Sequence, residues 1–149
     1  MSSIYNMEAR SNSPQKTRKI AQNLAHTLKG GEVIALFGDL GAGKTIFVQG
    51  LAKGLNLKRP VVSPTFVFMR SYPIIAKGRK LTFYHIDLYR GENSKDFENL
   101  GLSEIFTKDS IVVLEWADKI KDILPKKRVD IFIEKIDENT RKIKIDRRG

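Results

Sequence analysis

The 149 residues include no cysteine, and 27 lysines and arginines against 17 aspartates and glutamates give a formal net charge of +10. The absence of cysteine excludes disulfides, thiolate nucleophiles and cysteine-based metal sites, and we expect a reducing, cytoplasmic setting. No run approaches the ~20 apolar residues that span a bilayer, so we expect no membrane partner. The length predicts one domain over residues 1–149, with residues 1–12 as a flexible N-terminal segment. The basic excess favours anionic partners.

The first predicted elements are a helix, a buried strand and a second helix. Ser13 followed by Pro14 is typical of a helix N-cap with proline in the first turn, and Gly30–Gly31 ends this helix. The run EVIALF, residues 32–37, is the short apolar stretch expected of a strand buried on both faces. A glycine-rich turn follows, and apolar residues then recur at helical spacing from Val48 to Leu55.

The second half of the chain predicts more strands. VVSPTFVFMRSY, residues 61–72, indicates a loop entering a strand, and a turn at 77–80 joins it to a strand at 81–86. Residues 111–114 form another buried apolar run, and alternating residues between 129 and 145 predict a closing hairpin. Two hairpins must add antiparallel strands to a parallel centre. We therefore predict an α/β fold, a three-layer P-loop NTPase-like domain with a mixed, centrally parallel sheet.

The stretch GDLGAGKT matches the full phosphate-loop pattern. Its glycines let backbone N–H groups approach phosphates at the start of a helix, while the lysine reaches phosphate oxygens and the threonine hydroxyl reaches Mg²⁺. Strand and helix flank it in the required order. The predicted ATP-binding residues are Gly38, Asp39, Leu40, Gly41, Ala42, Gly43, Lys44 and Thr45.

Three further residues are candidates for catalysis. Glu115 ends a buried apolar strand, where a carboxylate can join Thr45 as a Mg²⁺ ligand or hold metal-bound water. Thr65, in SPTF, is a candidate γ-phosphate sensor, although a hydroxyl capping a turn explains it equally well. Asp87, in YHIDLYR, can orient the attacking water or lie behind the metal, or it can be a paired structural carboxylate. His85 is more simply a packed histidine.

The ordered set GDLGAGKT, SPTF, YHIDLYR and VLEWADKI resembles the TsaE (YjeE) family, bacterial ATPases needed for threonylcarbamoyladenosine in tRNA. The resemblance runs from about Ser13 to the final hairpin. It implies catalytic roles for Lys44, Thr65, Asp87 and Glu115, with Thr45 and Glu115 as Mg²⁺ ligands. It also implies a nucleotide contact for Asp118, and more loosely one for Thr17 near the adenine.

The same resemblance implies partners rather than a modifying activity of the chain itself. ATP hydrolysis would support a complex of TsaB and TsaD, with tRNA reached through that complex. We expect slow turnover alone, because no arginine finger can be assigned within the chain, although Arg90 is the best internal candidate. The basic closing region, with eleven basic and six acidic residues from 119 to 149, can face tRNA, a partner or water.

Two other functions remain open on the residues alone. A small-molecule kinase shares the phosphate loop, but we find no segment that supplies its arginine-bearing lid. A non-catalytic nucleotide- or RNA-binding module fits the charge of +10, but the chain lacks aromatic stacking motifs.

Overall fold

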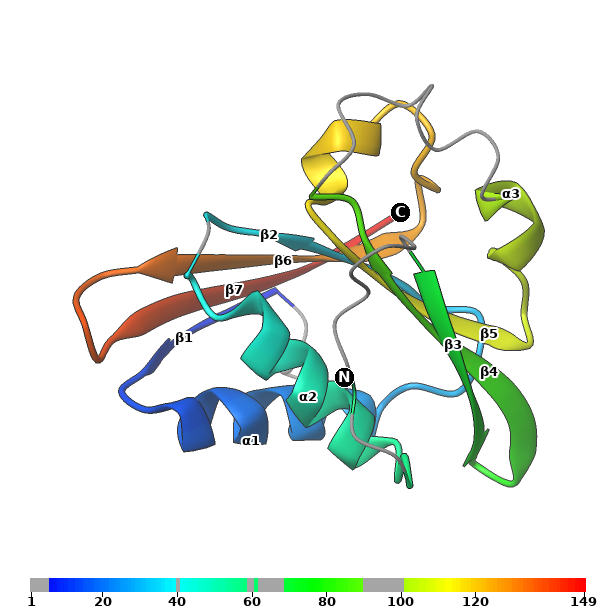
Figure 1. Cartoon of the computed structure of the whole chain (residues 1–149), viewed down its shortest axis with the longest axis horizontal. Helices are drawn as coiled ribbons and strands as arrows, with labels where there is room; N and C mark the ends of the chain where they lie inside the picture. The colour runs from blue at the N-terminus through cyan, green and yellow to red at the C-terminus, as the bar shows by residue number, and fades with distance from the viewer. Residues whose placement is uncertain (1–5, 40, 59–60, 62–68, 90–100) are drawn as a thin grey trace.

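A computed structural model describes residues 6–39, 41–58, 61, 69–89 and 101–149 (Figure 1). The described strands are β1 (Met7–Ser11), β2 (Val33–Phe37), β3 (Met69–Ala76), β4 (Arg79–Asp87), β5 (Ser110–Glu115), β6 (Arg128–Lys135) and β7 (Arg141–Arg148). The described helices are α1 (Pro14–Ala25), α2 (Lys44–Gly54), α3 (Leu102–Ile105) and the 3-10 helix η2 (Ala117–Ile120).

The strands form one mixed sheet in the order β1-β7-β6-β2-β5-β4-β3. β2 runs parallel to both β5 and β6, and β5 runs parallel to β4. The outer pairs, β3 with β4, β6 with β7 and β1 with β7, are antiparallel. The predicted mixed sheet with a parallel centre is confirmed. In such a sheet the carboxyl ends of the parallel strands, where β2 and β5 end, are the usual place for ligands.

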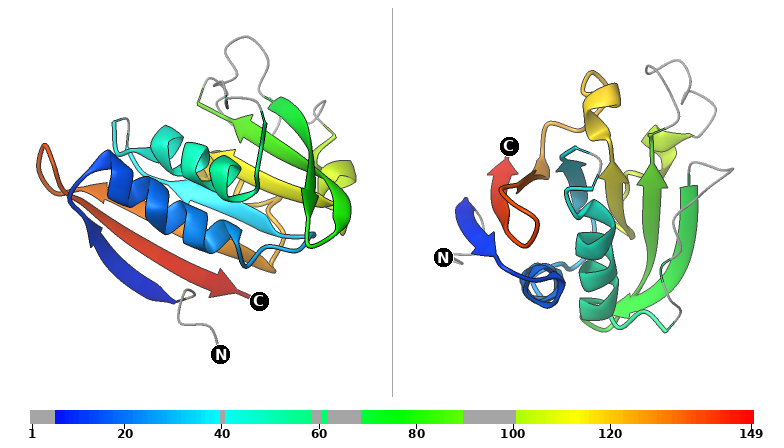
Figure 2. Two further views of the ribbon diagram at one scale, coloured as in Figure 1. Left: turned by 90° about the horizontal axis from the view of Figure 1, so that it is seen from below. Right: turned by 60° about the vertical axis from the view of Figure 1, so that its left-hand side comes forward.

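Helices α1 and α2 lie side by side over one face of the sheet (Figure 2). Ser13 caps α1, since its side chain accepts a hydrogen bond from the Lys16 N–H at 3.1 Å. The two helices approach closely at glycines of α2. A Cβ on Gly50 would lie 2.5 Å from the Arg18 carbonyl oxygen, and one on Gly54 would lie 2.5 Å from the Cβ of Ala25. These contacts pack the second half of α2 directly against α1.

The opposite face of the sheet is covered by α3 and η2. Leu102 of α3, Ala117 and Ile120 of η2, and Leu124 pack against alternate residues of β2, β4 and β5. The helical segment that follows Trp116, η2, is a single 3-10 turn. No helix in the described part of the chain is long and apolar enough to span a bilayer.

The prediction that residues 1–12 are flexible is wrong for Met7–Ser11. These residues form β1, an edge strand whose register with β7 runs from Met7 opposite Ile145 to Ser11 opposite Arg141. The sequence MEARS carries no apolar run, so the strand depends on pairing with β7. Residues 1–5 lie outside the described residues.

Candidate functional site

The phosphate loop links the end of β2 to the first residue of α2. Gly41 and Gly43 have φ values of 81° and 107°, in the left-handed region that favours glycine. A Cβ on Gly41 would meet nothing within 4 Å, so the loop there faces open space. Gly43 is the N-cap of α2, whose first turn carries Lys44 and the exposed hydroxyl-bearing Thr45. This geometry presents a positive helix end at an open loop. Leu40 lies outside the described residues.

Lys44 is buried beneath the loop. Its Nζ donates to the carbonyl oxygens of Gly38 and, at 2.9 Å, of Asp39. The same Nζ lies 4.0 Å from the ring centroid of Trp116, a cation–π contact. Trp116 has a φ of 60°, a conformation uncommon for a bulky residue, and it follows Glu115 directly. The turn after β5 thus places the indole against the phosphate-loop lysine.

Carboxylates gather around the Lys44 ammonium. Burial lowers the Lys44 pKa from its ordinary value of 10.5, and the negative charges of Glu115, Asp87, Asp39 and Asp118 oppose this shift in descending order. Asp118 is exposed on η2, whereas Glu115 is only 3% exposed. The structure therefore brings five of the predicted site residues into one electrostatic cluster: Lys44, Asp39, Asp87, Glu115 and Asp118.

Glu115 and Asp87 stand opposite each other at the ends of β5 and β4. Their Cα atoms are register partners, and Glu115 also pairs with Leu36 of β2, just before the phosphate loop. Burial raises the Asp87 pKa above its ordinary value of 3.8, and the Glu115 charge raises it further. Hydrogen bonding from the Tyr89 N–H, at 3.0 Å, opposes that rise. A carboxyl group with a raised pKa beside a phosphate loop suits proton transfer or water orientation.

His85, which the sequence suggested as a packed histidine, holds the Glu115 carboxylate. Its ring is fully buried, and Nε2 lies 2.5 Å from the Glu115 Oε2. A carboxylate can only accept, so Nε2 carries the proton of this hydrogen bond. The other ring nitrogen, Nδ1, is buried without a hydrogen-bond partner among the described residues. The sequence carried one hint of this contact. Side chains alternate along a strand, so His85 and Asp87 lie on the same face of β4.

Thr17 lies apart from this cluster. Thr17 is buried in α1, and its hydroxyl lies 2.7 Å from the Ser11 hydroxyl, so it serves a contact between β1 and α1. Its role in nucleotide binding stays a prediction. Thr65 and Arg90 lie outside the described residues.

The site residues fit a partly hydrated Mg²⁺ rather than a metal enclosed by protein. No group of three or more His, Cys, Asp and Glu residues within the described ranges is arranged to hold a metal ion. Mg²⁺ normally keeps several waters and takes only one or two protein ligands beside substrate phosphates. The Glu115 carboxylate, which His85 orients, and the exposed hydroxyl of Thr45 match that donor set.

Comparisons with known proteins found a matching family model, similar sequences and a similar solved structure. A family model described as "Threonylcarbamoyl adenosine biosynthesis protein TsaE" matches residues 11–143. A Bacillus subtilis tRNA threonylcarbamoyladenosine biosynthesis protein TsaE is 41% identical over 130 residues, covering 87% of this chain and 78% of the relative. The Aquifex aeolicus protein of the same name is 44% identical over 140 residues, covering 91% and 92%. A crystal structure of Bacillus subtilis YdiB aligns with a TM-score of 0.78 at 35% identity, covering 96% of this chain and 86% of that one.

Proposed function

The chain belongs to the TsaE family of tRNA threonylcarbamoyladenosine biosynthesis proteins, and from this membership we propose that it is a Mg²⁺-dependent ATPase. One observation carries the proposal. The phosphate loop opens beside the buried carboxylate of Glu115, at the end of the strand next to β2, and His85 holds that carboxylate in place. A phosphate loop next to an oriented carboxylate is the arrangement that nucleotide hydrolysis needs.

The loop residues Gly38–Thr45 bind the ATP phosphates. Lys44 exchanges its bonds to the carbonyl oxygens of Gly38 and Asp39 for bonds to phosphate oxygens, which are stronger because the donor and the acceptor then carry opposite charges. Asp118, exposed after Trp116, is available to the nucleotide from η2. Thr17 is the weaker candidate for the base end of the ligand.

Glu115 and Thr45 hold Mg²⁺, which neutralises charge on the phosphates when it is bound. His85 fixes the direction of the Glu115 carboxylate, so this ligand needs no reorientation. Asp87, opposite Glu115 in the register, orients the attacking water or takes its proton. Its raised pKa, caused mainly by burial, brings it nearer to the range useful for a general base. Thr65 is proposed to sense the γ-phosphate.

We further propose that hydrolysis supports a TsaB–TsaD complex in the cytoplasm, with tRNA reached through that complex. Turnover is weak in the isolated chain and rises with the partners, because a phosphate-loop ATPase without an assigned arginine finger gains orders of magnitude when the missing charge is supplied. No membrane partner is expected.

ATP hydrolysis by the pure chain, alone and with TsaB, TsaD and tRNA, tests this function. The expected result is weak activity that rises with the partners and falls at least ~100-fold in Glu115→Ala, since one metal ligand is lost. Hydrolysis that ignores both the partners and Glu115→Ala would overturn the proposal. Transfer of labelled phosphate to a metabolite would indicate a kinase, and salt-sensitive tRNA binding that ignores ATP would indicate an RNA-binding module.

A further inference from the structure

Arg141, the first residue of β7, joins the closing hairpin to the phosphate loop. Its Nε donates to the Ala42 carbonyl oxygen at 2.9 Å, and its Nη2 donates to the Gly41 carbonyl oxygen at 3.3 Å. Its Nη1 donates to the carbonyl oxygens of Asp137 and Thr140, at 2.9 and 3.2 Å, within the turn between β6 and β7. One guanidinium thus bonds two separate backbone segments, and the turn fixes its orientation.

Strand alternation explains why Arg141 points toward the loop. Ile143 and Ile145 lie two and four residues further along β7 and are buried in the core beneath α1 and α2. Arg141 has the same parity, so its side chain leaves the sheet on the same face as α2. Lys142 has the opposite parity and forms an ion pair with Glu8 of β1 at 3.4 Å. The neighbouring residues Arg141 and Lys142 therefore have the same charge, but their side chains lie on opposite faces of the sheet.

The start of the phosphate loop also rests on this hairpin. A Cβ on Gly38 would lie only 2.6 Å from the Ile133 carbonyl oxygen of β6, so the loop backbone passes directly over that strand. The register of β2 and β6 continues to Phe37 opposite Phe132, one residue before Gly38. Figure 1 shows the β6–β7 turn at the same end of the sheet as the connection from β2 to α2. The hairpin contacts both Gly38 and the later residues of the loop.

The bond to Ala42 also fixes the direction of an amide. A trans peptide is planar, so its carbonyl and the following N–H point in opposite directions. With the Ala42 carbonyl held toward Arg141, the Gly43 N–H is directed away from the hairpin. A Cβ on Gly43 would lie 4.0 Å from the Arg141 Nε, which confirms how near the guanidinium is to this peptide. Gly43 is the N-cap of α2, where an N–H group without a helical acceptor meets an anion.

We propose that Arg141 is a positioning residue for the phosphate loop: its guanidinium holds the Gly41 and Ala42 carbonyls on the hairpin side, so that the Gly43 amide, which follows the Ala42 carbonyl, is set for a phosphate before it binds. The Ala42 amide is already engaged, since its N–H donates to the Asp39 carbonyl oxygen at 3.0 Å. This role rests on the proposed function, because it gives the closing hairpin a part in ATP binding. It acts through the loop backbone and requires the planar guanidinium, since a lysine ammonium is one compact nitrogen with three rotatable donors and cannot bond the four carbonyls that the guanidinium spans.

Binding of ATP with Mg²⁺ by isothermal titration calorimetry tests the proposal on Arg141→Gln, Arg141→Lys and the matched control Lys142→Gln. Arg141→Gln should weaken binding by about tenfold or more, as expected for losing charge-assisted hydrogen bonds that orient the site. Arg141→Lys, which keeps the charge, should recover less than half of that loss on a logarithmic scale. Lys142→Gln removes the same charge one residue away and should bind like the unmodified protein.

Two results of the titration would overturn the positioning role. Full recovery in Arg141→Lys would show that only the charge acts. Equal affinities for Arg141→Gln and Lys142→Gln would show that Arg141 does not contribute to binding.

Hydrogen exchange of the nucleotide-free protein gives a readout that does not depend on ATP. In Arg141→Gln the Ala42 amide, which donates to the Asp39 carbonyl oxygen at 3.0 Å within the loop, should exchange about tenfold faster, while the amides of β2 stay protected, because only the loop is released. Unchanged loop exchange in a folded Arg141→Gln would refute the inference. Should that variant fail to fold, Arg141→Lys gives the same comparison. If the unmodified protein binds no ATP, the proposed function fails, yet exchange still decides whether Arg141 holds the loop.

Discussion

Two buried carboxylates lie on the strands that flank β2, and their partners differ. Glu115 of β5 is 3% exposed and pairs in register with Leu36, while Asp130 of β6 is 1% exposed and pairs with Ala35. Because Leu36 and Ala35 are consecutive, the two carboxylates leave the sheet on opposite faces. Glu115 faces α2 and the phosphate loop, and Asp130 faces away from them.

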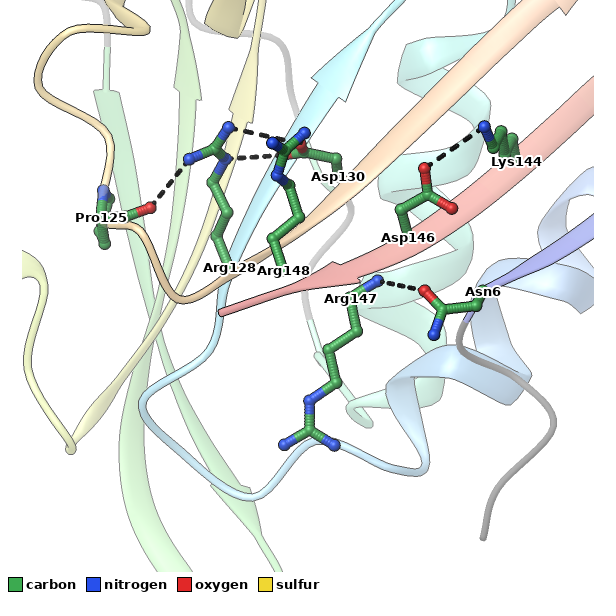
Figure 3. A network of polar contacts seen from close by, with 8 residues as sticks. All are labelled: Asn6, Pro125, Arg128, Asp130, Lys144, Asp146, Arg147 and Arg148. Atoms are coloured by element: carbon green, nitrogen blue, oxygen red, sulfur yellow. Dashed lines mark hydrogen bonds and ion pairs between the residues drawn. The ribbon is translucent and has the colours of Figure 1, made fainter.

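Asp130 is bonded on both oxygens by guanidinium groups (Figure 3). Arg128 Nε lies 2.7 Å from its Oδ1, and Arg148 Nη1 lies 3.3 Å from its Oδ2. Glu115, in contrast, has a single described hydrogen bond, from His85 to Oε2. A carboxylate can accept about four hydrogen bonds, so Glu115 keeps acceptor capacity among the described residues. Charge neutralisation by two arginines indicates a folding role, and a single orienting partner indicates a binding role.

The largest expected effect is on stability, in Asp130→Asn. The amide carries no charge and turns an N–H₂ group toward the guanidiniums, so the free energy of unfolding should fall by about 2–3 kcal/mol. ATP hydrolysis at 25 °C should be unchanged. Urea denaturation followed by circular dichroism measures the difference.

Glu115→Gln is the matched variant for Asp130→Asn. Its amide oxygen can still accept from His85, so stability should change by less than ~1 kcal/mol while hydrolysis is lost. A Glu115→Gln protein as unstable as Asp130→Asn, or an Asp130→Asn protein without activity, would contradict the contrast between the two carboxylates.

A smaller effect should follow from releasing Glu115 without removing it. His85→Leu deletes the hydrogen bond to Oε2, and the Mg²⁺ concentration for half-maximal hydrolysis should rise about tenfold, as for other residues behind a metal ligand. His85→Gln places an N–H donor near the position of Nε2 and should restore part of the loss. A Mg²⁺ titration of ATP hydrolysis by both variants measures this. Equal Mg²⁺ requirements in the two variants would show that the hydrogen bond does not orient Glu115.

The sequence predicted the parts of the fold and site that local patterns determine. The apolar runs that became β2 and β5, the Ser13 cap and the loop from Gly38 to Thr45 all carry their signal within a few residues. The parallel centre followed from their order along the chain. Local signals therefore predicted where phosphate and carboxylate groups meet.

Contacts that depend on long-range register were out of reach. Arg141 meets Ala42 only because the β6–β7 hairpin extends past the end of β2, and nothing near either residue encodes that length. The β1 strand has a polar sequence and owes its place to β7. Pro73 lies inside β3, which the edge position of that strand allows. The bond from His85 to Glu115 was open to prediction in part, since alternation placed His85 on the face of Asp87.

The smallest expected effect concerns Asp137, an exposed carboxylate in the turn that orients Arg141. Its Oδ1 accepts the Asn139 N–H at 2.9 Å, and this bond, followed by one from the Thr140 side chain, lowers the Asp137 pKa below its ordinary value of 3.8. A carboxyl group with a lowered pKa in the folded state stabilises the turn at neutral pH, and that contribution is lost as pH falls through the lowered pKa.

An NMR titration of the Asn139 amide should therefore show a midpoint below 3.8. In Asp137→Asn this titration should disappear, while ATP affinity stays unchanged, because an asparagine oxygen accepts the same bond and the Asp137 carbonyl that meets Arg141 belongs to the backbone. A midpoint above 3.8 would contradict the lowered pKa. A large loss of ATP affinity would instead show that the charge of this exposed carboxylate, and not only the backbone of its turn, acts on the phosphate loop.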